Sequence, residues 1–382
     1  MDSYRIPFNK PCLAGRELQY VADAISRGNI AGGGHFTAKC RELLRTALRV
    51  PHVLLTTSCT HALEMAALLL DIAPGDEVIV PSFTFVSCVN AFVLRGAKPV
   101  FADVRRDTLN LDDTCLESLI TPRTKAIVVV HYAGVACSMD TIGEIAARHG
   151  IAIVEDNAHG LFASFQGRPL GTFGTFATLS FHETKNIICG EGGALLINDA
   201  HLMERAEIIH EKGTNRNRYF RGQIDKYTWV DVGSSYAPSE ILAAFLYAQL
   251  EAREVIHAAR RRLWDRYANL LCEWARLHDV RLPYVPGECE QSYHMFYILL
   301  PSLAVRHALI AHLKSRGILA VFHYQALHLS DMGQRFGGRP GMCPVTEEAS
   351  DCLLRLPFFN DLSVQEQGEV VDGLLCFDGW NR

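Results

Sequence analysis

The 382-residue chain has few lysines and no long apolar segment. No stretch approaches the roughly 18–20 apolar residues that a membrane-spanning helix needs. The first residues, MDSYRIPFNKPCLAG, lack the apolar core of a signal peptide. No basic run is long enough to indicate a nucleic-acid partner, and the net charge is −5. We therefore expect a cytoplasmic protein that binds neither membranes nor nucleic acid.

Metal-binding and redox motifs are also missing. The nearest two of the 12 cysteines, Cys343 and Cys352, are nine residues apart, so the chain has no C-x-x-C. H-E-x-x-H is absent despite 16 histidines, which argues against a zinc hydrolase. We expect the cysteines to be reduced and mostly buried thiols, and we expect no bound metal.

Short runs rich in valine and isoleucine alternate with helical patterns. The expected strands are HVLLTTS (52–58), EVIVP (77–81), PVFADV (99–104), AIVVVH (126–131), IAIVED (151–156) and FATLSF (176–181). Helices are expected between them, at 60–71, 84–96 and 139–150. This alternation predicts a mostly parallel sheet covered by helices on both faces, an α/β fold.

The pattern changes near residue 250. A long helical stretch over about 237–276 is followed by HMFYILL (294–300), a helix near 303–316 and GILAVFHY (317–324). A chain of this length has room for two domains. We predict a large domain over 1–250 and a smaller C-terminal α/β domain over 251–382.

Lys185, one of only eight lysines, follows FATLSF and precedes GEGG (190–193). A partly apolar cleft would lower the pKa of such a lysine and make its amine a better nucleophile for Schiff-base formation. Asp156 ends the predicted strand 151–156, where it can point at a ligand or cap a following helix. Lys185 and Asp156 form the pair that pyridoxal phosphate requires, with the acid on the pyridine nitrogen.

A phosphate group needs hydrogen-bond donors. TTSCTHAL (56–63) runs from a predicted strand straight into a predicted helix. Ser58, Cys59 and Thr60 lie where the helix begins, so they either hold a phosphate or serve as an ordinary helix cap. Ser180, at the end of a neighbouring strand, could add a hydroxyl group.

A flat cofactor ring needs groups on its faces. Phe85 in PSFTF could stack on the ring, or it could be a core residue. His159, three residues after Asp156, could pack on the other face or bond to the phenolic oxygen, although a single histidine carries little information. The order along the chain, with phosphate site, aromatic, aspartate and then lysine, supports a pyridoxal phosphate site.

The chain resembles the nucleotide-sugar aminotransferases of the DegT/StrS type, which are pyridoxal phosphate enzymes of fold type I. The resemblance runs from GGGHF (32–36) to RLPFF (355–359). Its motifs are CTHALEMAALLLDIAPGDEVIVPSFTFVS, VHYAGVACSMD, SFHETKN, GEGG, EKGTNR, FRGQIDKYTW and DVGSSY. It implies a large domain with a mostly parallel sheet and a smaller C-terminal α/β domain.

The resemblance also implies residue roles. Lys185 would form the Schiff base and move the proton, Asp156 would keep the pyridine nitrogen protonated, and His159 would lie near the ring oxygen. Phe85 would stack on the ring, while Cys59, Thr60 and Ser180 would hold the phosphate. In this family a homodimer partner completes the phosphate site through a segment matching GSSYAPSE (233–240), in which Ser235 stands where many members have asparagine.

The substrates implied by the resemblance are L-glutamate, which leaves as 2-oxoglutarate, and a dTDP-4-keto-6-deoxyhexose. The amino group would pass through pyridoxamine phosphate to C4, in the galacto or gluco configuration. The basic segment KGTNRNRYFRGQ (212–223) is either a diphosphate-binding loop, with Arg216, Arg218 and Arg221 as candidates, or a solvated loop. His323, Tyr324 and His328 are either sugar-binding or core residues.

Other functions stay open. A 3-keto sugar nucleotide could be the acceptor, or the chain could be a non-catalytic regulator that binds pyridoxal phosphate or a sugar nucleotide. A pyridoxal phosphate-dependent sugar dehydratase is disfavoured, because such enzymes typically have histidine in place of the lysine found here as Lys185.

Overall fold

A computed structural model describes residues 4–381 of the chain. Its centre is a seven-stranded sheet in the order β1-β9-β8-β5-β4-β2-β3. The strands are β1 His52–Thr56, β2 Glu77–Pro81, β3 Lys98–Ala102, β4 Thr124–Val130, β5 Ala152–Asp156, β8 Phe176–Ser180 and β9 Gly193–Ile197. β9 is antiparallel to β1 and β8, and the pairs from β8 to β3 are all parallel. The predicted mostly parallel sheet is confirmed.

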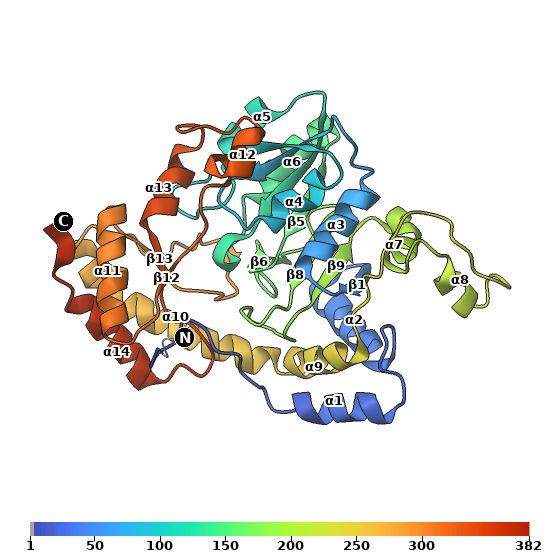
Figure 1. Cartoon of the computed structure of the whole chain (residues 1–382), viewed down its shortest axis with the longest axis horizontal. Coiled ribbons are helices and arrows are strands. Elements are labelled where there is room, and N and C mark those ends of the chain that lie inside the picture. Colours follow the sequence, from blue (N-terminus) through green and yellow to red (C-terminus); the bar gives the residue numbers. More distant parts are fainter. Residues whose placement is uncertain (1–3, 382) are drawn as a thin grey trace.

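Helices cover both faces of this sheet (Figure 1). One face is covered by α3 Cys59–Leu69, α4 Ser87–Val93 and α7 Met203–His210. The other is covered by α2 His35–Leu48, α5 Asp113–Leu119, α6 Met139–His149 and α9 Glu240–Glu251. Strand β4 is apolar at successive positions because Val128 packs toward the first face and Ile127 and Val129 toward the second.

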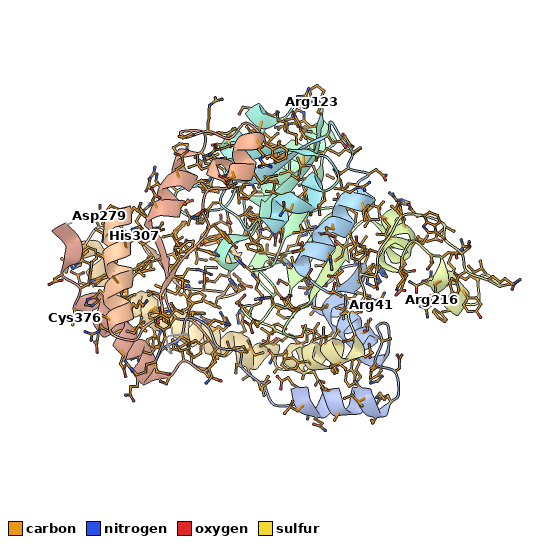
Figure 2. The ribbon with its side chains drawn as sticks, viewed as in Figure 1. Arg41, Arg123, Arg216, Asp279, His307 and Cys376 are labelled. Atoms are coloured by element: carbon orange, nitrogen blue, oxygen red, sulfur yellow. The ribbon has the colours of Figure 1, made fainter. Side chains whose placement is uncertain are left out.

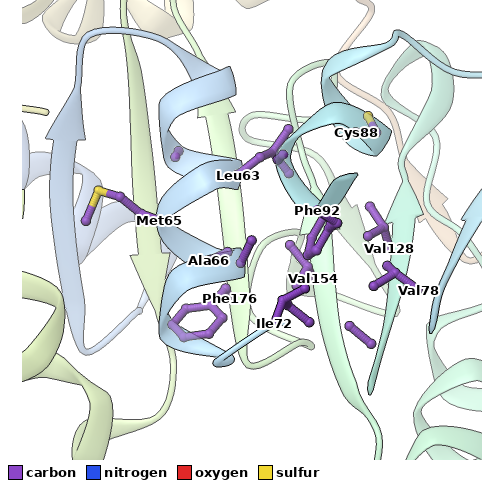
Figure 3. Close-up of a cluster of buried hydrophobic side chains, with 14 of the residues drawn as sticks. Leu63, Met65, Ala66, Ile72, Val78, Cys88, Phe92, Val128, Val154 and Phe176 are labelled. Carbon is purple, nitrogen blue, oxygen red and sulfur yellow. The ribbon is translucent and has the colours of Figure 1, made fainter. Parts of the chain in front are cut away.

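The core under α3 and α4 fixes these helices on the sheet. In Figure 3, Leu63 of α3 and Phe92 of α4 lie in one cluster with Val128, Val154 and Phe176 of the sheet. All five side chains are buried. Because α3 begins at the carboxyl edge of the sheet, this packing also fixes its first turn at that edge.

A second core lies in the C-terminal part. Its sheet has the order β11-β13-β12, formed by β11 Tyr297–Leu299, β13 Leu353–Arg355 and β12 Val321–Phe322 in antiparallel pairs. Helices α10 Arg253–Leu277, α11 Leu303–Ser315 and α14 Val364–Leu375 pack with it. The beginning of the chain joins this core, since Ile6 is buried there and its N–H donates to Gly317 O at 3.0 Å.

The remaining elements are short or peripheral. They are α1 Glu17–Ser26, α8 Arg216–Phe220, α12 Asp331–Arg335, α13 Pro344–Cys352, β6 Ser164–Phe165, β7 Arg168–Pro169 and β10 Cys289–Glu290. Helix α8 belongs to a segment that projects from the body of the molecule (Figure 1). None of the helices formed by residues 4–381 is both long and apolar enough to cross a lipid bilayer.

Two predicted elements differ in the structure. The helical stretch over 237–276 is two helices, α9 and α10, which meet at Ala252. Helix α9 packs on the large sheet, whereas α10 from Leu263 onward packs in the C-terminal core. The helix expected at 84–96 begins only at Ser87 and ends at Val93. The domain boundary near residue 250 stays a prediction.

Candidate active site

A cavity of about 800 Å³ opens at the carboxyl edge of the large sheet, between the two cores. Ten of the residues predicted from the sequence line it: Ser58, Cys59, Thr60, Phe85, Asp156, His159, Ser180, Lys185, His323 and Tyr324. Ligands in open α/β sheets bind at this edge, because strand ends and helix N-termini meet there. The structure thus brings most of the predicted site together, while the role of each residue stays a prediction.

Lys185 lies in the loop that joins β8 to β9. The loop is held closed by backbone hydrogen bonds from Phe181 N to Gly192 O at 2.8 Å and from Glu183 N to Gly190 O at 2.9 Å. The Lys185 N–H donates to His182 O at 2.9 Å. Burial lowers the pKa of the Lys185 amine, and the negative charge of Asp156 acts in the opposite direction. The amine is therefore more readily neutral than that of an exposed lysine.

GEGG brings the start of β9 against the start of α3. A Cβ atom on Gly193 would lie 2.4 Å from the Cys59 nitrogen and 2.4 Å from the Ser58 carbonyl carbon. Only glycine fits there without a backbone shift. The glycines after Lys185 predicted a close backbone approach, and the structure shows that Gly193 approaches the first turn of α3.

Asp156 ends β5, and no helix begins directly after it. Its Oδ1 accepts the Ala158 N–H at 3.0 Å, and its Oδ2 accepts the thiol of Cys88 at 2.7 Å. Cys88 comes from α4 and also lies 3.0 Å from the Thr84 hydroxyl. The helix-cap alternative for Asp156 is therefore wrong, and the carboxylate is held at the cavity wall.

Ser58 is the N-cap of α3, where its Oγ accepts the His61 N–H at 3.1 Å. The first turn of the helix leaves the N–H groups of Cys59 and Thr60 outside the helical hydrogen-bond pattern. The Thr60 hydroxyl lies 2.8 Å from that of Ser87, and the Cys59 thiol lies 3.4 Å from the Thr178 hydroxyl. The helix cap and the anion site are compatible, because the Ser58 hydroxyl caps the helix while the N–H groups remain available for an anion.

The two predicted ring neighbours both reach the cavity. Phe85 lies just before α4 and is 56% exposed, so it is not a core residue. His159 is buried, and its ring stacks on His294 with centroids 4.2 Å apart. Its Nδ1 has no hydrogen-bond partner among residues 4–381. Burial and the nearby charges of Lys185 and Arg355 hold the pKa of His159 well below 6.5. Its imidazole is neutral at physiological pH.

His323 and Tyr324 enter the cavity from the C-terminal part. Their rings are stacked with centroids 3.6 Å apart, and His323 Nδ1 lies 2.8 Å from the Tyr132 hydroxyl. Tyr324 has a φ of 37°, an uncommon value for a residue with a side chain. Burial holds the pKa of His323 well below 6.5 and raises that of Tyr324, so both are uncharged hydrogen-bonding groups.

Five candidates lie outside the cavity of their own chain. Arg218 and Arg221 pair with Glu204 and Glu207 at 3.4 and 2.8 Å, and Arg216 lies on the projecting segment (Figure 2). The other two are Ser235, which bridges to Glu211 in a short backbone pairing, and His328, which is fully buried. His328 Nδ1 lies 2.7 Å from the Ser82 hydroxyl and its Nε2 lies 3.0 Å from Glu347, so it is a core residue.

Several cavity-side residues were not identified from the sequence, and three of them enter the argument below. They are Cys88, His294 and Arg355, of which the last two line the cavity. His294 is the first residue of HMFYILL, a segment whose apolar character indicated only a strand. Arg355 opens the quoted RLPFF, yet a basic residue among apolar ones gives no local sign of facing a cavity.

The family of the chain follows from comparison with known proteins. The DegT/DnrJ/EryC1/StrS aminotransferase family matches residues 11–375. The chain is also similar to the aminotransferase TlmJ of Streptoalloteichus hindustanus, with 30% identity, a TM-score of 0.86 and coverage of 98% of this chain and 97% of that one. DesV of S. venezuelae has 30% identity and a TM-score of 0.87, with 97% and 98% of the chains covered.

A third similar structure is Spr1654 of Streptococcus pneumoniae, assigned as a sugar aminotransferase, in its PMP form. It has 25% identity and a TM-score of 0.90, and the match covers 97% of this chain and 98% of that one. Lys185 and Asp156 lie together at the carboxyl edge of a mostly parallel sheet, where the sequence predicts the cofactor site. The chain belongs to the DegT/DnrJ/EryC1/StrS aminotransferase family and is an aminotransferase.

Proposed function

We propose that the chain uses pyridoxal phosphate to transfer the amino group of L-glutamate to C4 of a dTDP-4-keto-6-deoxyhexose. The observation that carries this proposal is that Lys185, Asp156 and the first turn of α3 face one cavity. The sequence motifs also resemble those of dTDP-4-amino-4,6-dideoxygalactose transaminase, which supports this choice of sugar. The PMP and PLP forms of Spr1654 support the cofactor.

The residues present fit pyridoxal phosphate. The N–H groups of Cys59 and Thr60 and the hydroxyl of Ser180 would hold the phosphate. Asp156 would bind the pyridine nitrogen, since its carboxylate is fixed at the cavity wall. His159 has a buried Nδ1 without a partner, which an oxygen on the ring would satisfy.

The chemistry of the transfer needs a base that moves one proton. Bound pyridoxal phosphate supplies an electron sink for the charge left when a proton leaves the carbon next to nitrogen. Lys185, whose pKa is lowered, accepts the proton from the α-carbon of the donor and later delivers a proton to C4 of the sugar. The orientation of the sugar relative to Lys185 then sets the configuration at C4.

A second copy of the chain completes the site in this proposal. The projecting segment exposes the apolar side chains Tyr219, Phe220, Tyr227, Trp229, Val230 and Val232. Phe85 and Val86, beside the cavity, are exposed as well. Contiguous exposed apolar surface marks an interface. A homodimer would cover these residues and bring the segment with Arg216, Arg218, Arg221 and Ser235 to the cavity of the neighbour.

Mixed subunits test the shared site. One chain would carry Lys185→Ala, and the other would carry glutamine at all three predicted diphosphate arginines. Each homodimer should be inactive in amine transfer. Mixing with subunit exchange should restore activity, because one site per heterodimer then has an intact lysine and an intact segment from its neighbour. No restored activity, with heterodimers shown by native mass spectrometry, would mean that the arginines act in their own chain. An arginine variant that is fully active by itself would mean that the three arginines have no role in the reaction.

The substrate is tested with the purified enzyme, pyridoxal phosphate, L-glutamate and dTDP-4-keto-6-deoxyglucose. Proton NMR of the product gives the H3–H4 coupling. A small coupling means an axial amine, the galacto product, and a large coupling means an equatorial amine, the gluco product. A yellow, folded protein that forms no amino sugar rejects this substrate, and a 3-keto sugar nucleotide is then the next acceptor to try. A protein that stays colourless with added pyridoxal phosphate would contradict the proposed cofactor site.

A further inference from the structure

Arg355 is the last residue of β13 and lines the cavity. Its Nη2 donates to Phe322 O at 3.2 Å, and its guanidinium lies over the ring of Phe8 at 4.6 Å from the centroid. The backbone pairs with Tyr297 on one side and Val321 on the other. The side chain is therefore fixed at its base by a sheet and at its tip by an aromatic ring and a carbonyl oxygen.

Within the described part of the chain, this guanidinium has no negatively charged partner. Among residues 4–381, no carboxylate forms an ion pair with Arg355, and its Nε is buried without an acceptor. Burial lowers the pKa of Arg355, and the phenols of Tyr132 and Tyr324 act in the opposite direction. Arg355 is partly buried, and a partly buried cation without a counterion favours the binding of an anion.

The carboxylates of the cavity are engaged elsewhere. Asp156 accepts hydrogen bonds from Cys88 and Ala158, and Glu191 lies 3.5 Å from His182 at the exposed rim. Arg355 and Lys185 line the cavity together with His159, and the charges of both lower the pKa of His159. An anionic ligand would be attracted to these two charges.

We propose that Arg355 binds an anionic group of a substrate during amine transfer. This inference rests on the proposed function, in which both substrates are anions that occupy the cavity in turn. Arginine pairs with carboxylate and phosphoryl oxygens through two parallel hydrogen bonds. The predicted diphosphate arginines lie on another segment, so the carboxylate of the amino donor is the group that still lacks a partner.

The test compares Arg355→Gln and Arg355→Lys with Arg306→Gln as a matched control. Arg306 donates to Ser350 O at 2.6 Å, lies over the ring of Phe322 at 5.8 Å and has a buried Nε without a partner. It resembles Arg355 in these contacts but does not line the cavity. Titration calorimetry of the holoenzyme would measure the dissociation constants of two probes separately. The probes are glutarate, a dicarboxylate that cannot react, and dTDP.

We expect Arg355→Gln to weaken glutarate binding by roughly tenfold to a hundredfold and to leave dTDP binding unchanged. Arg355→Lys should fall between, because it keeps the charge but loses the paired donors. A loss confined to dTDP would assign the phosphoryl group to Arg355 instead, and losses with both probes would mean that they share this anion site. Equal binding of both probes by the Arg355→Gln variant and the wild type overturns the inference.

The controls separate this inference from a structural effect and from the proposed function. An equal loss in Arg306→Gln would show that general damage to the C-terminal part explains the result, and the inference fails. A wild-type holoenzyme that binds neither probe also overturns it. If glutarate binding depends on Arg355 but no amine reaches any keto sugar nucleotide, the proposed function is wrong and the anion site stands.

Discussion

The thiol of Cys88 donates a hydrogen bond to Asp156, with Sγ 2.7 Å from Oδ2. Both side chains are buried, and the second carboxylate oxygen is already bonded to the Ala158 N–H. Burial, the negative charge of Asp156 and its hydrogen bond with the thiol raise the pKa of Cys88, so the sulfur keeps its proton and remains a donor. A residue of α4 thereby orients the acid of β5.

Replacing Cys88 should lower the free energy of unfolding, and the loss should depend on whether the new side chain can still donate a hydrogen bond to Asp156. Cys88→Ala leaves a buried carboxylate oxygen without its partner and should lower the free energy of unfolding by about 1–3 kcal/mol. Cys88→Ser keeps a donor and should cost less. Urea unfolding of the cofactor-free protein measures both, with Cys376→Ala, an exposed cysteine, as the control.

The same variants should also change the protonation of the ring nitrogen of bound pyridoxal phosphate. If Cys88 orients Asp156, the ¹⁵N chemical shift of pyridine-labelled pyridoxal phosphate in the holoenzyme should report a less protonated ring nitrogen in Cys88→Ala than in the wild type. The shift in Cys88→Ser should stay near that of the wild type. An unchanged shift in both variants would reduce Cys88 to a packing residue.

Acidic pH should destabilise the protein through three buried histidines that line the cavity. Burial is the largest cause that holds the pKa of His159, His294 and His323 well below 6.5. Near pH 6.5 and below, the unfolded chain takes up protons that the folded chain does not, so stability is full above that pH and declines as the pH falls. Each histidine that stays neutral in the folded protein should lower the free energy of unfolding at pH 5.5 by about 1–1.5 kcal/mol relative to its value above pH 6.5.

His294→Gln isolates one of these contributions. The charged and titratable groups near His294 are His159, Lys185, Arg260 and His323, all of which disfavour a positive charge on it. The variant should lose less stability than the wild type between pH 7.5 and 5.5, measured by urea unfolding at each pH. His201→Gln, at an exposed histidine, should follow the wild-type curve. Parallel curves for His294→Gln and the wild type would contradict the explanation.

The projecting segment should control self-association. Trp229 is 76% exposed and lies among the other apolar side chains of that segment. Trp229→Glu places a charge in the proposed interface and should raise the dissociation constant of the dimer at least tenfold. Sedimentation velocity over a concentration series measures this constant. Leu277→Glu changes an apolar residue that is 64% exposed at the end of α10 and should have no effect.

The sheet was predictable because its strands are buried on both faces. A strand such as β2, at 77–81, has apolar residues at nearly every position, and its bounds agree with the prediction. The start of α4 was not predictable from periodicity. The apolar Phe85 and Val86 continue the helical pattern, yet Phe85 lines the cavity and the helix begins at Ser87.

The candidate site was predictable to the extent that its residues carry local signals. Lys185 has glycines after it, Asp156 ends a predicted strand, and Ser58 precedes a predicted helix. Arg355 and His294 have no such signal, because they come near the cavity only when the C-terminal sheet packs against the large domain. Placing the segment with Arg216 requires a second chain, which a single sequence does not supply.

Gly193→Ala should displace the backbone at the start of α3 without replacing any side chain that lines the cavity. The added Cβ would lie 2.4 Å from the Cys59 nitrogen, so the first turn of α3 must shift. We expect a loss of roughly 1–3 kcal/mol in the free energy of unfolding and a weaker affinity for pyridoxal phosphate, measured by fluorescence titration.

Gly143→Ala is the matched control, since this glycine lies inside α6 and a Cβ there meets open space. It should leave cofactor affinity unchanged and raise stability by up to about 1 kcal/mol. Weaker cofactor binding by Gly193→Ala at temperatures where it is fully folded would place the phosphate at the first turn of α3. Unchanged binding by a folded Gly193→Ala protein would exclude the N–H groups of Cys59 and Thr60 from that role.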